Sequence, residues 1–182
     1  MRFIQTKIAG LVIIEPAVFS DSRGYFMESY QKRIFLDNGI DADFVQENIS
    51  FSRKGTLRGL HFQRSPHSQG KLVRVTLGCV YDVAVDLRAQ SATFGRFFGL
   101  ELSEENHRAL YIPPGFAHGF YALSDRAQFS YKCTAYYAPH SEGGVRWNDP
   151  TIGVPWPLDG PPLLSPKDEQ LPLLADAKVP LD

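Results

Sequence analysis

Several features that mark common protein classes are scarce in this chain of 182 residues. It has two cysteines, Cys79 and Cys133, which form no Cys-x-x-Cys pair, so neither a zinc motif nor a dithiol redox motif is supported. Each cysteine lies in an apolar alternating run, which favours buried free thiols and a reducing compartment. The apolar stretch 8–14 is short, and no small-residue cleavage site follows it, so we expect no signal peptide. These observations predict a cytoplasmic protein.

Long apolar runs and an excess of one charge are also missing. No stretch approaches the roughly 18 consecutive apolar residues of a membrane helix. Lysine and arginine together number 19, against 20 aspartate and glutamate residues, for a net charge of -1. This balance creates no positive field for nucleic acid, and the chain has no basic block that would bind a membrane. We therefore expect neither nucleic acid nor a membrane as a partner.

The binding loops of several enzyme classes are absent as well. The chain has no Gly-x-Gly-x-x-Gly after a strand, no Walker loop and no Gly-x-Ser-x-Gly elbow. Chemistry on a redox cofactor, phosphoryl transfer and serine hydrolysis all lose support for this reason.

The sequence is instead rich in β patterns. Between Cys79 and Leu87 the residues alternate with a period of two, which puts Asp82 and Asp86 on one face and predicts that this face is wet or lines a polar cavity. Further strands are expected over 72–77, 94–102, 109–112, 119–123 and 128–137. Helix signals are few: residues 31–38 could form two turns, and Ser165 is a plausible N-cap for a short helix.

Many short strands separated by Gly, Pro, Ser and Asn predict an all-β fold, an antiparallel sandwich or barrel with a few short peripheral helices. The length suits one domain over residues 1–182. Proline is frequent after Pro139, but Trp147 and Trp156 are interleaved with it, so we expect an ordered wrap rather than a linker.

The stretch from Leu57 to Lys71 carries the strongest chemical signal. It places His61 and Lys71 around the start of a β-patterned segment. Histidine can take or give a proton near neutral pH, and lysine can hold developing negative charge, so the pair suggests proton abstraction beside a carbonyl. An isolated histidine is more often a core residue, and a lysine at a strand end is usually solvated. The neighbouring Arg58 and Gln63 favour a polar pocket.

Three more side chains have both a structural and a chemical interpretation. Tyr131 and Tyr137 share strand parity with Phe129, so they are either core aromatics or the lining of a cavity in which a hydroxyl returns a proton. Asp168 can close a capping box with Ser165, or it can orient a histidine as the third member of a triad does. The sequence leaves these alternatives open.

His118 lies in a Pro-x-Gly-x-x-His turn, a pattern also found in metal-binding cupins, which raises the alternative of a metal site. Such cupins bring a His-x-His pair and a glutamate from an earlier strand. Here the earlier segment has His61-Phe62-Gln63, and His67 does not restore the spacing. A mononuclear site needs about three protein ligands, so we expect no metal.

Taken together, these segments resemble the dTDP-4-dehydrorhamnose 3,5-epimerase family of metal-free cupins. The resemblance covers residues 10 to about 174 and rests on several motifs in the same order. They read FSDSRGYFME (19–28), FVQEN (44–48), LRGLHFQ (57–63), GKLVR (70–74), IPPGFAHGF (112–120) and WNDP (147–150). Only the loop 64–68 is variable.

The resemblance implies a jelly-roll cupin that acts as a homodimer, with N-terminal strands helping to form the partner's sheet. It implies the substrate dTDP-4-dehydro-6-deoxy-D-glucose, the product dTDP-4-dehydro-L-rhamnose on the route to bacterial surface polysaccharide, and no cofactor. His61 would be the base, Asp168 its dyad partner, Tyr131 the acid on the opposite face, and Lys71 the holder of the C4 oxygen. The residues implied in substrate binding are Arg23, Glu28, Gln46, Glu47, Asn48, Arg58, His118, Tyr137, Glu142 and Lys167, with Tyr137 stacking on the thymine.

Three alternatives stay open from the sequence. Relatives with this fold epimerise only C3 or only C5 in the synthesis of unusual deoxysugars. A non-catalytic sugar-nucleotide binding module would need the same pocket without a working base. A metal-dependent cupin oxygenase has the least support.

Overall fold

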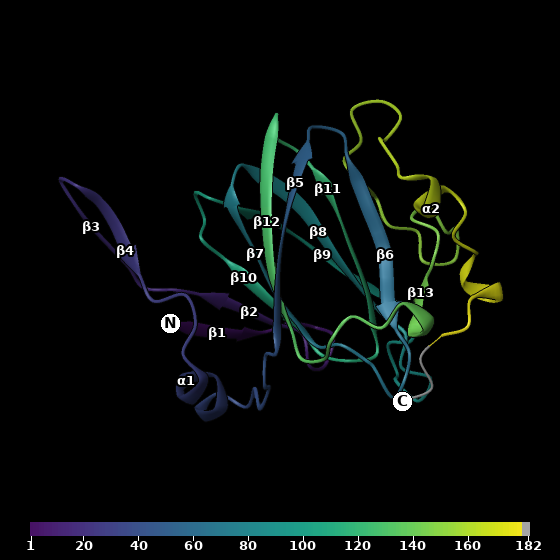
Figure 1. Ribbon diagram of the computed structural model, residues 1–182, viewed down its shortest axis with the longest axis horizontal. Helices are drawn as coiled ribbons and strands as arrows, with labels where there is room; N and C mark the ends of the chain where they lie inside the picture. Colours follow the sequence, from purple (N-terminus) through teal and green to yellow (C-terminus); the bar gives the residue numbers. More distant parts are fainter. Residues whose placement is uncertain (180–182) are drawn as a thin grey trace.

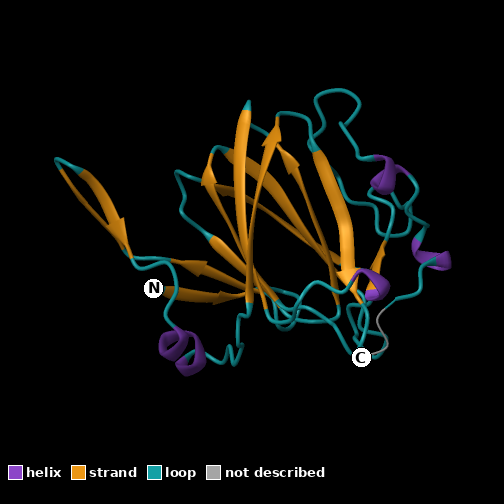
Figure 2. Cartoon of the chain, in the orientation of Figure 1, coloured by secondary structure: helices purple, strands orange, loops and turns teal. Residues whose placement is uncertain are grey.

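The structure is a computed structural model and describes residues 1–179. It consists of two antiparallel sheets packed face to face, with a hairpin that projects from one end (Figure 1). One sheet has the order β1-β2-β10-β7-β12-β5, with β1 Arg2–Gln5, β2 Val12–Glu15, β10 Ala109–Ile112, β7 Lys71–Leu77, β12 Arg126–Cys133 and β5 Gln46–Arg53. The other has the order β13-β6-β11-β8-β9, with β13 Glu142–Gly144, β6 Leu57–Gln63, β11 Phe116–Ala122, β8 Cys79–Asp86 and β9 Phe97–Ser103. The predicted all-β fold is confirmed, and Figure 2 shows how little helix accompanies it.

The helices are short and peripheral. Helix α1 spans Lys32–Asp37 and α2 spans Pro166–Glu169, with 3-10 turns η1 at Pro139–Ser141 and η2 at Leu174–Asp176. Ser165 caps α2 as predicted, since its side chain accepts a hydrogen bond from the Asp168 backbone N–H. No helix within residues 1–179 is long and apolar enough to cross a membrane.

The main core lies between the two sheets and follows from the alternation of the strands. Val80 and Ala84 of β8 meet Val73 of β7 and Phe129 of β12 there, all nearly inaccessible to solvent. The odd residues of β8, such as Val83, point to the other side, where the segment after Gly144 covers the sheet with Trp156 and its neighbours. The ordered wrap predicted from the interleaved tryptophans is therefore present. A third cluster packs α1 against the outer face of β2 and β7.

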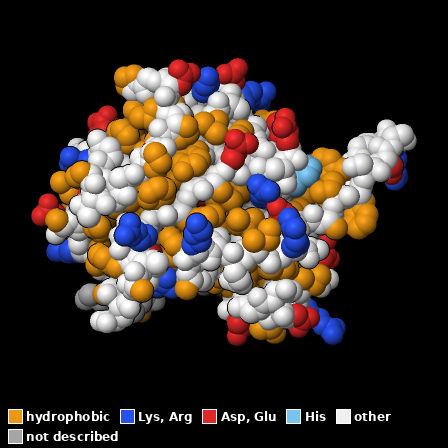
Figure 3. All heavy atoms as spheres, turned by 180° about the vertical axis from the view of Figure 1, so that it is seen from behind, with side chains coloured by type: hydrophobic (Ala, Val, Ile, Leu, Met, Phe, Trp, Pro, Cys, Tyr) orange, Lys and Arg blue, Asp and Glu red, His pale blue; other side chains and the backbone are white. Residues whose placement is uncertain are grey.

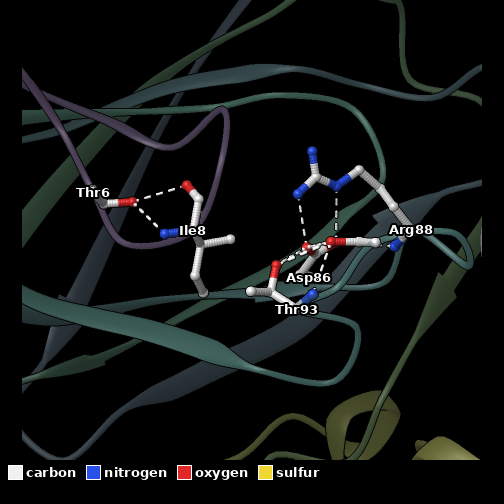
Figure 4. Close-up of polar contacts among 6 residues, drawn as sticks. Thr6, Ile8, Asp86, Arg88 and Thr93 are labelled. Atoms are coloured by element: carbon white, nitrogen blue, oxygen red, sulfur yellow. Dashed lines mark hydrogen bonds and ion pairs between the residues drawn. The ribbon is translucent and has the colours of Figure 1, made fainter.

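Asp82 and Asp86 share the face of β8 that looks between the sheets, and both are fully buried. The prediction that this face is wet or lines a cavity is wrong for Asp86, because that carboxylate is satisfied by protein groups instead. It accepts bonds from Arg88 Nε at 2.9 Å, Ser91 Oγ at 2.6 Å and Thr93 Oγ1 at 2.6 Å (Figure 4). Burial works to raise the pKa of Asp86, but these hydrogen bonds outweigh it and lower the pKa to about 2.

Some predicted strand boundaries were wrong for local reasons. The strand predicted over 128–137 ends at Cys133, after which Thr134 contacts Gly70 and the chain leaves the sheet. The strand predicted to start at Phe94 begins at Phe97, because residue 95 lies in a turn. Gly95 adopts a positive φ of 74° there, and its backbone N–H donates to the Asp86 carbonyl. Both cysteines are free: Cys133 is buried as expected, and Cys79 is half-buried.

The projecting hairpin, called the arm below, pairs β3 Val18–Asp21 with β4 Gly24–Met27. It stands clear of both sheets (Figure 1), and apolar side chains gather on the part of the arm nearest the sheets (Figure 3). Phe19 is 65% exposed and Phe26 is 70% exposed. Large aromatic side chains on a two-stranded hairpin have no core of their own to enter, so the arm has the composition of a contact surface.

Candidate active site

A two-chambered cavity opens between the sheets where the apolar core ends. The first chamber, about 380 Å³, is lined by Gln46, Asn48, His61, Phe62, Gln63, Gln69, Lys71, Tyr131, Tyr137 and Glu142. The second, about 270 Å³, is lined by Ser50, Arg58, His61, Lys71, His118, Gly119, Phe120, Phe129, Tyr131, Ser165 and Asp168. His61, Lys71 and Tyr131 belong to both lists. Three of the four residues expected to do chemistry therefore lie at the junction of the chambers, and the fourth lines the second.

His61 and Asp168 form a dyad across the edge of the site. Strand β6 brings His61 and α2 brings Asp168, and His61 Nε2 lies 2.5 Å from Asp168 Oδ1. Ser165 Oγ donates to the other carboxylate oxygen at 2.8 Å. The two interpretations of Asp168 are structurally compatible, because its backbone N–H bonds the cap residue Ser165 while its carboxylate contacts His61.

The charge of Asp168 is supported by these contacts. Its carboxyl is buried, which raises the pKa, but the hydrogen bonds from His61 and Ser165 outweigh burial and leave the pKa below its usual value. A carboxylate bound to Nε2 holds the imidazole with its proton on that nitrogen. Within residues 1–179 Nδ1 of His61 has no hydrogen-bond partner, so its lone pair is the one left to accept a proton.

Lys71 is the first residue of β7 and is partly enclosed between the chambers. Within residues 1–179 its ammonium group makes no hydrogen bond or ion pair, whereas other lysines such as Lys132 have carboxylate partners. Burial lowers the pKa of Lys71, and the negative charges of Asp82 and Glu142 counteract this only in part. An ammonium group without a partner in an enclosed site is suited to an oxygen that gains negative charge.

Tyr131 faces His61 from the opposite wall. It lies in β12 of the six-stranded sheet, while His61 lies in β6 of the five-stranded sheet. Burial raises the pKa of Tyr131, so its hydroxyl keeps its proton at neutral pH. A flat ligand between the sheets would therefore meet a base on one face and an acid on the other.

Polar groups at the mouth of the first chamber come from three elements. Tyr137 Oη donates to Glu142 Oε2 at 2.8 Å, and Glu142 also pairs with Lys167. Gln46 Oε1 accepts from the Tyr137 backbone N–H at 2.9 Å. The hydrogen bond to Glu142 raises the pKa of Tyr137, and its exposed ring is available for stacking. Tyr137 reaches the cavity from the loop after β12. The prediction that it lies in the same strand as Tyr131 was therefore wrong.

Arg58 and His118 lie on the second chamber. Arg58 Nε donates to Ser52 Oγ and its Nη2 to the Phe51 carbonyl, both at 3.1 Å, so β5 holds the guanidinium at the rim. His118 Nε2 lies 2.7 Å from Asp82 Oδ1. The part of the chain that is described has no group of three or more His, Cys, Asp or Glu side chains that could hold a metal ion.

Four residues implied in binding line neither chamber: Lys167 reaches the first chamber only through its ion pair with Glu142, and the other three lie farther away. Glu47 points to the outer face of β5, where it pairs with Lys132, because a strand sends neighbouring residues to opposite faces. Arg23 is on the arm and pairs with Asp21 at 2.6 Å. Glu28 follows the arm and contacts Gln31.

Other lining residues were not among the catalytic or binding residues expected from the sequence, although Gln63 favoured a polar pocket there. Ser50 follows Gln46 and Asn48 on the inner face of β5, and alternation along that strand would have identified it. Gln63 and Gln69 flank the His61 and Lys71 positions in the sequence. Gln63 links two loops, since its side chain donates to the His67 carbonyl at 2.7 Å and accepts from the Ala138 N–H at 2.8 Å.

Comparison with known proteins identifies the family. A family model described as dTDP-4-dehydrorhamnose 3,5-epimerase matches residues 5–176. The dTDP-4-dehydrorhamnose 3,5-epimerase of Salmonella typhimurium is 53% identical over 178 residues, which cover 97% of this chain and 97% of that protein.

Solved structures agree with the sequence comparison. The epimerase RmlC from Legionella pneumophila, solved in complex with dTDP-4-keto-L-rhamnose, has a TM-score of 0.96 and 49% identity, covering 100% of this chain and 98% of that one. ChmJ, a 3'-monoepimerase from Streptomyces bikiniensis in complex with dTDP-quinovose, has a TM-score of 0.88 and 37% identity, covering 93% and 86%. The matches span nearly the whole chain, which therefore belongs to the dTDP-4-dehydrorhamnose 3,5-epimerase family.

Proposed function

We propose that the protein inverts C3 and C5 of dTDP-4-dehydro-6-deoxy-D-glucose to give dTDP-4-dehydro-L-rhamnose. The observation that carries this proposal is the position of His61 and Tyr131 on opposite sheets, with Lys71 beside both at the junction of two chambers. Family membership supports the substrate class, since relatives of about 50% identity bear the name of this activity.

The substrate's own chemistry makes such a site sufficient. The ketone at C4 acidifies the hydrogens on C3 and C5. His61 takes the C5 proton, the electron pair of the C–H bond moves into an enolate, and the Lys71 ammonium stabilises the charge on the C4 oxygen. Tyr131 gives its proton to C5 from the opposite face, which inverts the centre. Solvent then restores both proton carriers, and the sequence repeats at C3.

The contribution of each group to the rate acceleration can be estimated from its role. A positioned acid or base contributes roughly 10²–10⁴-fold, and one electrostatic donor contributes roughly 10²–10³-fold. Asp168 stabilises the imidazolium that forms on His61, as the aspartate of a catalytic triad does. Gln46, Asn48 and Tyr137 would hold the nucleotide end in the first chamber.

We also propose that the protein acts as a homodimer through the arm. Strand β5 is the last strand of its sheet, so one edge is unpaired, and its outward side chains Ile49 and Phe51 are 65% and 49% exposed. Exposed apolar edges recruit further strands. An arm laid along the partner's β5 would bury Phe26 and carry Arg23 towards the partner's chambers, whose walls β5 provides.

Incubation with the 4-keto sugar nucleotide in deuterium oxide, followed by proton NMR, tests the reaction. We expect deuterium at both C3 and C5 and the signals of the L-rhamno product. Label at one carbon only would favour a monoepimerase such as ChmJ. Substrate binding without label at either carbon would indicate a non-catalytic module and contradict the proposal.

A further inference from the structure

Two aspartates on the same face of β8 differ sharply in the number of hydrogen bonds that their carboxylates accept. Asp82 and Asp86 are both fully buried. Asp86 lies outside both chambers, and both its oxygens accept several hydrogen bonds (Figure 4). Asp82 has one partner, His118, and its Oδ2 is buried with no hydrogen-bond partner in the described part of the chain. A buried carboxylate that is so poorly satisfied costs stability, which points to a role other than folding.

The partner of Asp82 occupies a particular position. His118 lies directly opposite His61 in the register of β11 and β6, so the two side chains start about 5 Å apart. Both rings line the second chamber. Each ring binds an aspartate through the same nitrogen: His61 Nε2 lies 2.5 Å from Asp168 and His118 Nε2 lies 2.7 Å from Asp82.

The two pairs therefore present the same chemistry from one wall. Within residues 1–179, Nδ1 of neither histidine has a hydrogen-bond partner. A carboxylate can only accept, so a bound Nε2 carries the proton and Nδ1 keeps its lone pair. The His118 ring is held further by stacking on Phe129, with ring centroids 5.8 Å apart. The hydrogen bond to Asp82 and the stacking on Phe129 together fix the orientation of the His118 ring.

We propose that Asp82 is a positioning residue, which holds His118 with Nδ1 as a hydrogen-bond acceptor for a hydroxyl of the hexose beside the His61 base. This rests on the proposed function, because the ligand is the 4-keto sugar. The hexose has hydroxyl groups at C2 and C3, and the C3 hydroxyl adjoins a reacting carbon. A fixed acceptor next to the base contributes a hydrogen bond that is made equally in the ground state and in the transition state. His118 and Asp82 would act in binding, whereas Asp168 acts in proton transfer.

The first test needs no turnover. Long-range proton–nitrogen NMR of the histidine-labelled protein, with His118→Asn to assign the signals, should show His118 protonated at Nε2 and not at Nδ1. A His118 ring protonated at Nδ1 would overturn the proposal even if the protein proves to be an epimerase. A failure to epimerise would leave this measurement valid and would contradict the proposed function instead.

The second test separates binding from chemistry. Asp82→Asn should raise KM roughly 10- to 100-fold and change kcat little, because a bond made equally in ground and transition state affects binding alone. The rise should vanish in a His118→Asn background. Asp86→Asn is the matched control: it removes an equally buried carboxylate of the same strand and should lower the melting temperature while leaving KM and kcat unchanged. Kinetic constants of Asp82→Asn equal to those of Asp86→Asn would overturn the proposal.

Discussion

Replacing Lys71 with methionine should make the protein more stable and nearly inactive. Methionine has a similar length and no charge, so the substitution removes the ammonium group and keeps most of the packing. The ammonium group has no hydrogen bond or ion pair within residues 1–179, and burial lowers its pKa, which means that the folded protein tolerates the charge at a cost.

The size of both effects can be worked out from the site. Replacing a buried ion pair or triad with well-packed apolar side chains is neutral or stabilises the protein by about 1–4 kcal/mol, and an unpartnered buried charge has no attraction to lose. Lys71 is only partly enclosed, so we take the lower end, about 1–2 kcal/mol, or roughly 2–8 °C in melting temperature for a chain of this size. Loss of one electrostatic donor to the enolate should lower kcat by roughly 10²–10³-fold.

The sign of the pH dependence follows from the same shift. The folded-state pKa of Lys71 is lowered, so between the folded and unfolded pKa values the unfolded chain binds more protons. The free energy of unfolding of the wild type should therefore rise relative to that of the Lys71→Met variant as pH increases from the folded pKa towards the unfolded value of about 10.4.

Urea unfolding at several pH values and steady-state kinetics measure these effects. Lys54→Met is the control, since Lys54 pairs with Asp159 at the surface at 3.1 Å and neither residue lines the two chambers. It should change stability by at most about 1 kcal/mol and leave kcat unchanged. A Lys71→Met variant that is less stable than wild type would refute the reasoning, because Lys71 would then be making a stabilising pair.

Three further predictions concern the dyad, the cap and the arm. Asp168→Asn should cost about 1–3 kcal/mol at pH 7, and because the folded pKa of Asp168 is lowered, this difference should fade as pH drops below about 4, which urea unfolding at both pH values checks. Ser165→Ala should cost about 1 kcal/mol of stability and also lower kcat, since Ser165 Oγ holds the Asp168 carboxylate, while Ser165→Thr should restore both. Paired Phe19→Asp and Phe26→Asp should yield a folded monomer with little activity in analytical ultracentrifugation and kinetics, and an active dimer would contradict the assembly proposed.

Much of the fold was predictable because strand periodicity survives folding. The alternation along β8 and the Ser165 cap needed only local information, and both are present. The wet face predicted from the alternation was wrong for Asp86, because the turn that follows β8 supplies Arg88, Ser91 and Thr93 as its partners. Periodicity shows that two residues share a face but not what covers that face.

The sequence predicted which residues gather at the site better than it predicted where each side chain points. His61, Lys71 and Tyr131 converge on one site although about 70 residues separate His61 from Tyr131. Only the packing of the two sheets face to face brings them together. Glu47 shows the opposite case, since it follows Gln46 in the motif but points away from the cavity. The role of Asp82 depends on a cross-strand neighbour that a single sequence does not reveal.

The most direct test of the account uses the Tyr131→Phe variant in deuterium oxide. The central claim is that a base on one sheet and an acid on the other serve opposite faces of the sugar. Without the acid, His61 should still remove the C5 proton and return deuterium to the same face, so the recovered substrate should carry label at C5 with its configuration retained. Inversion of C5 at the wild-type rate would contradict the claim that Tyr131 is the acid.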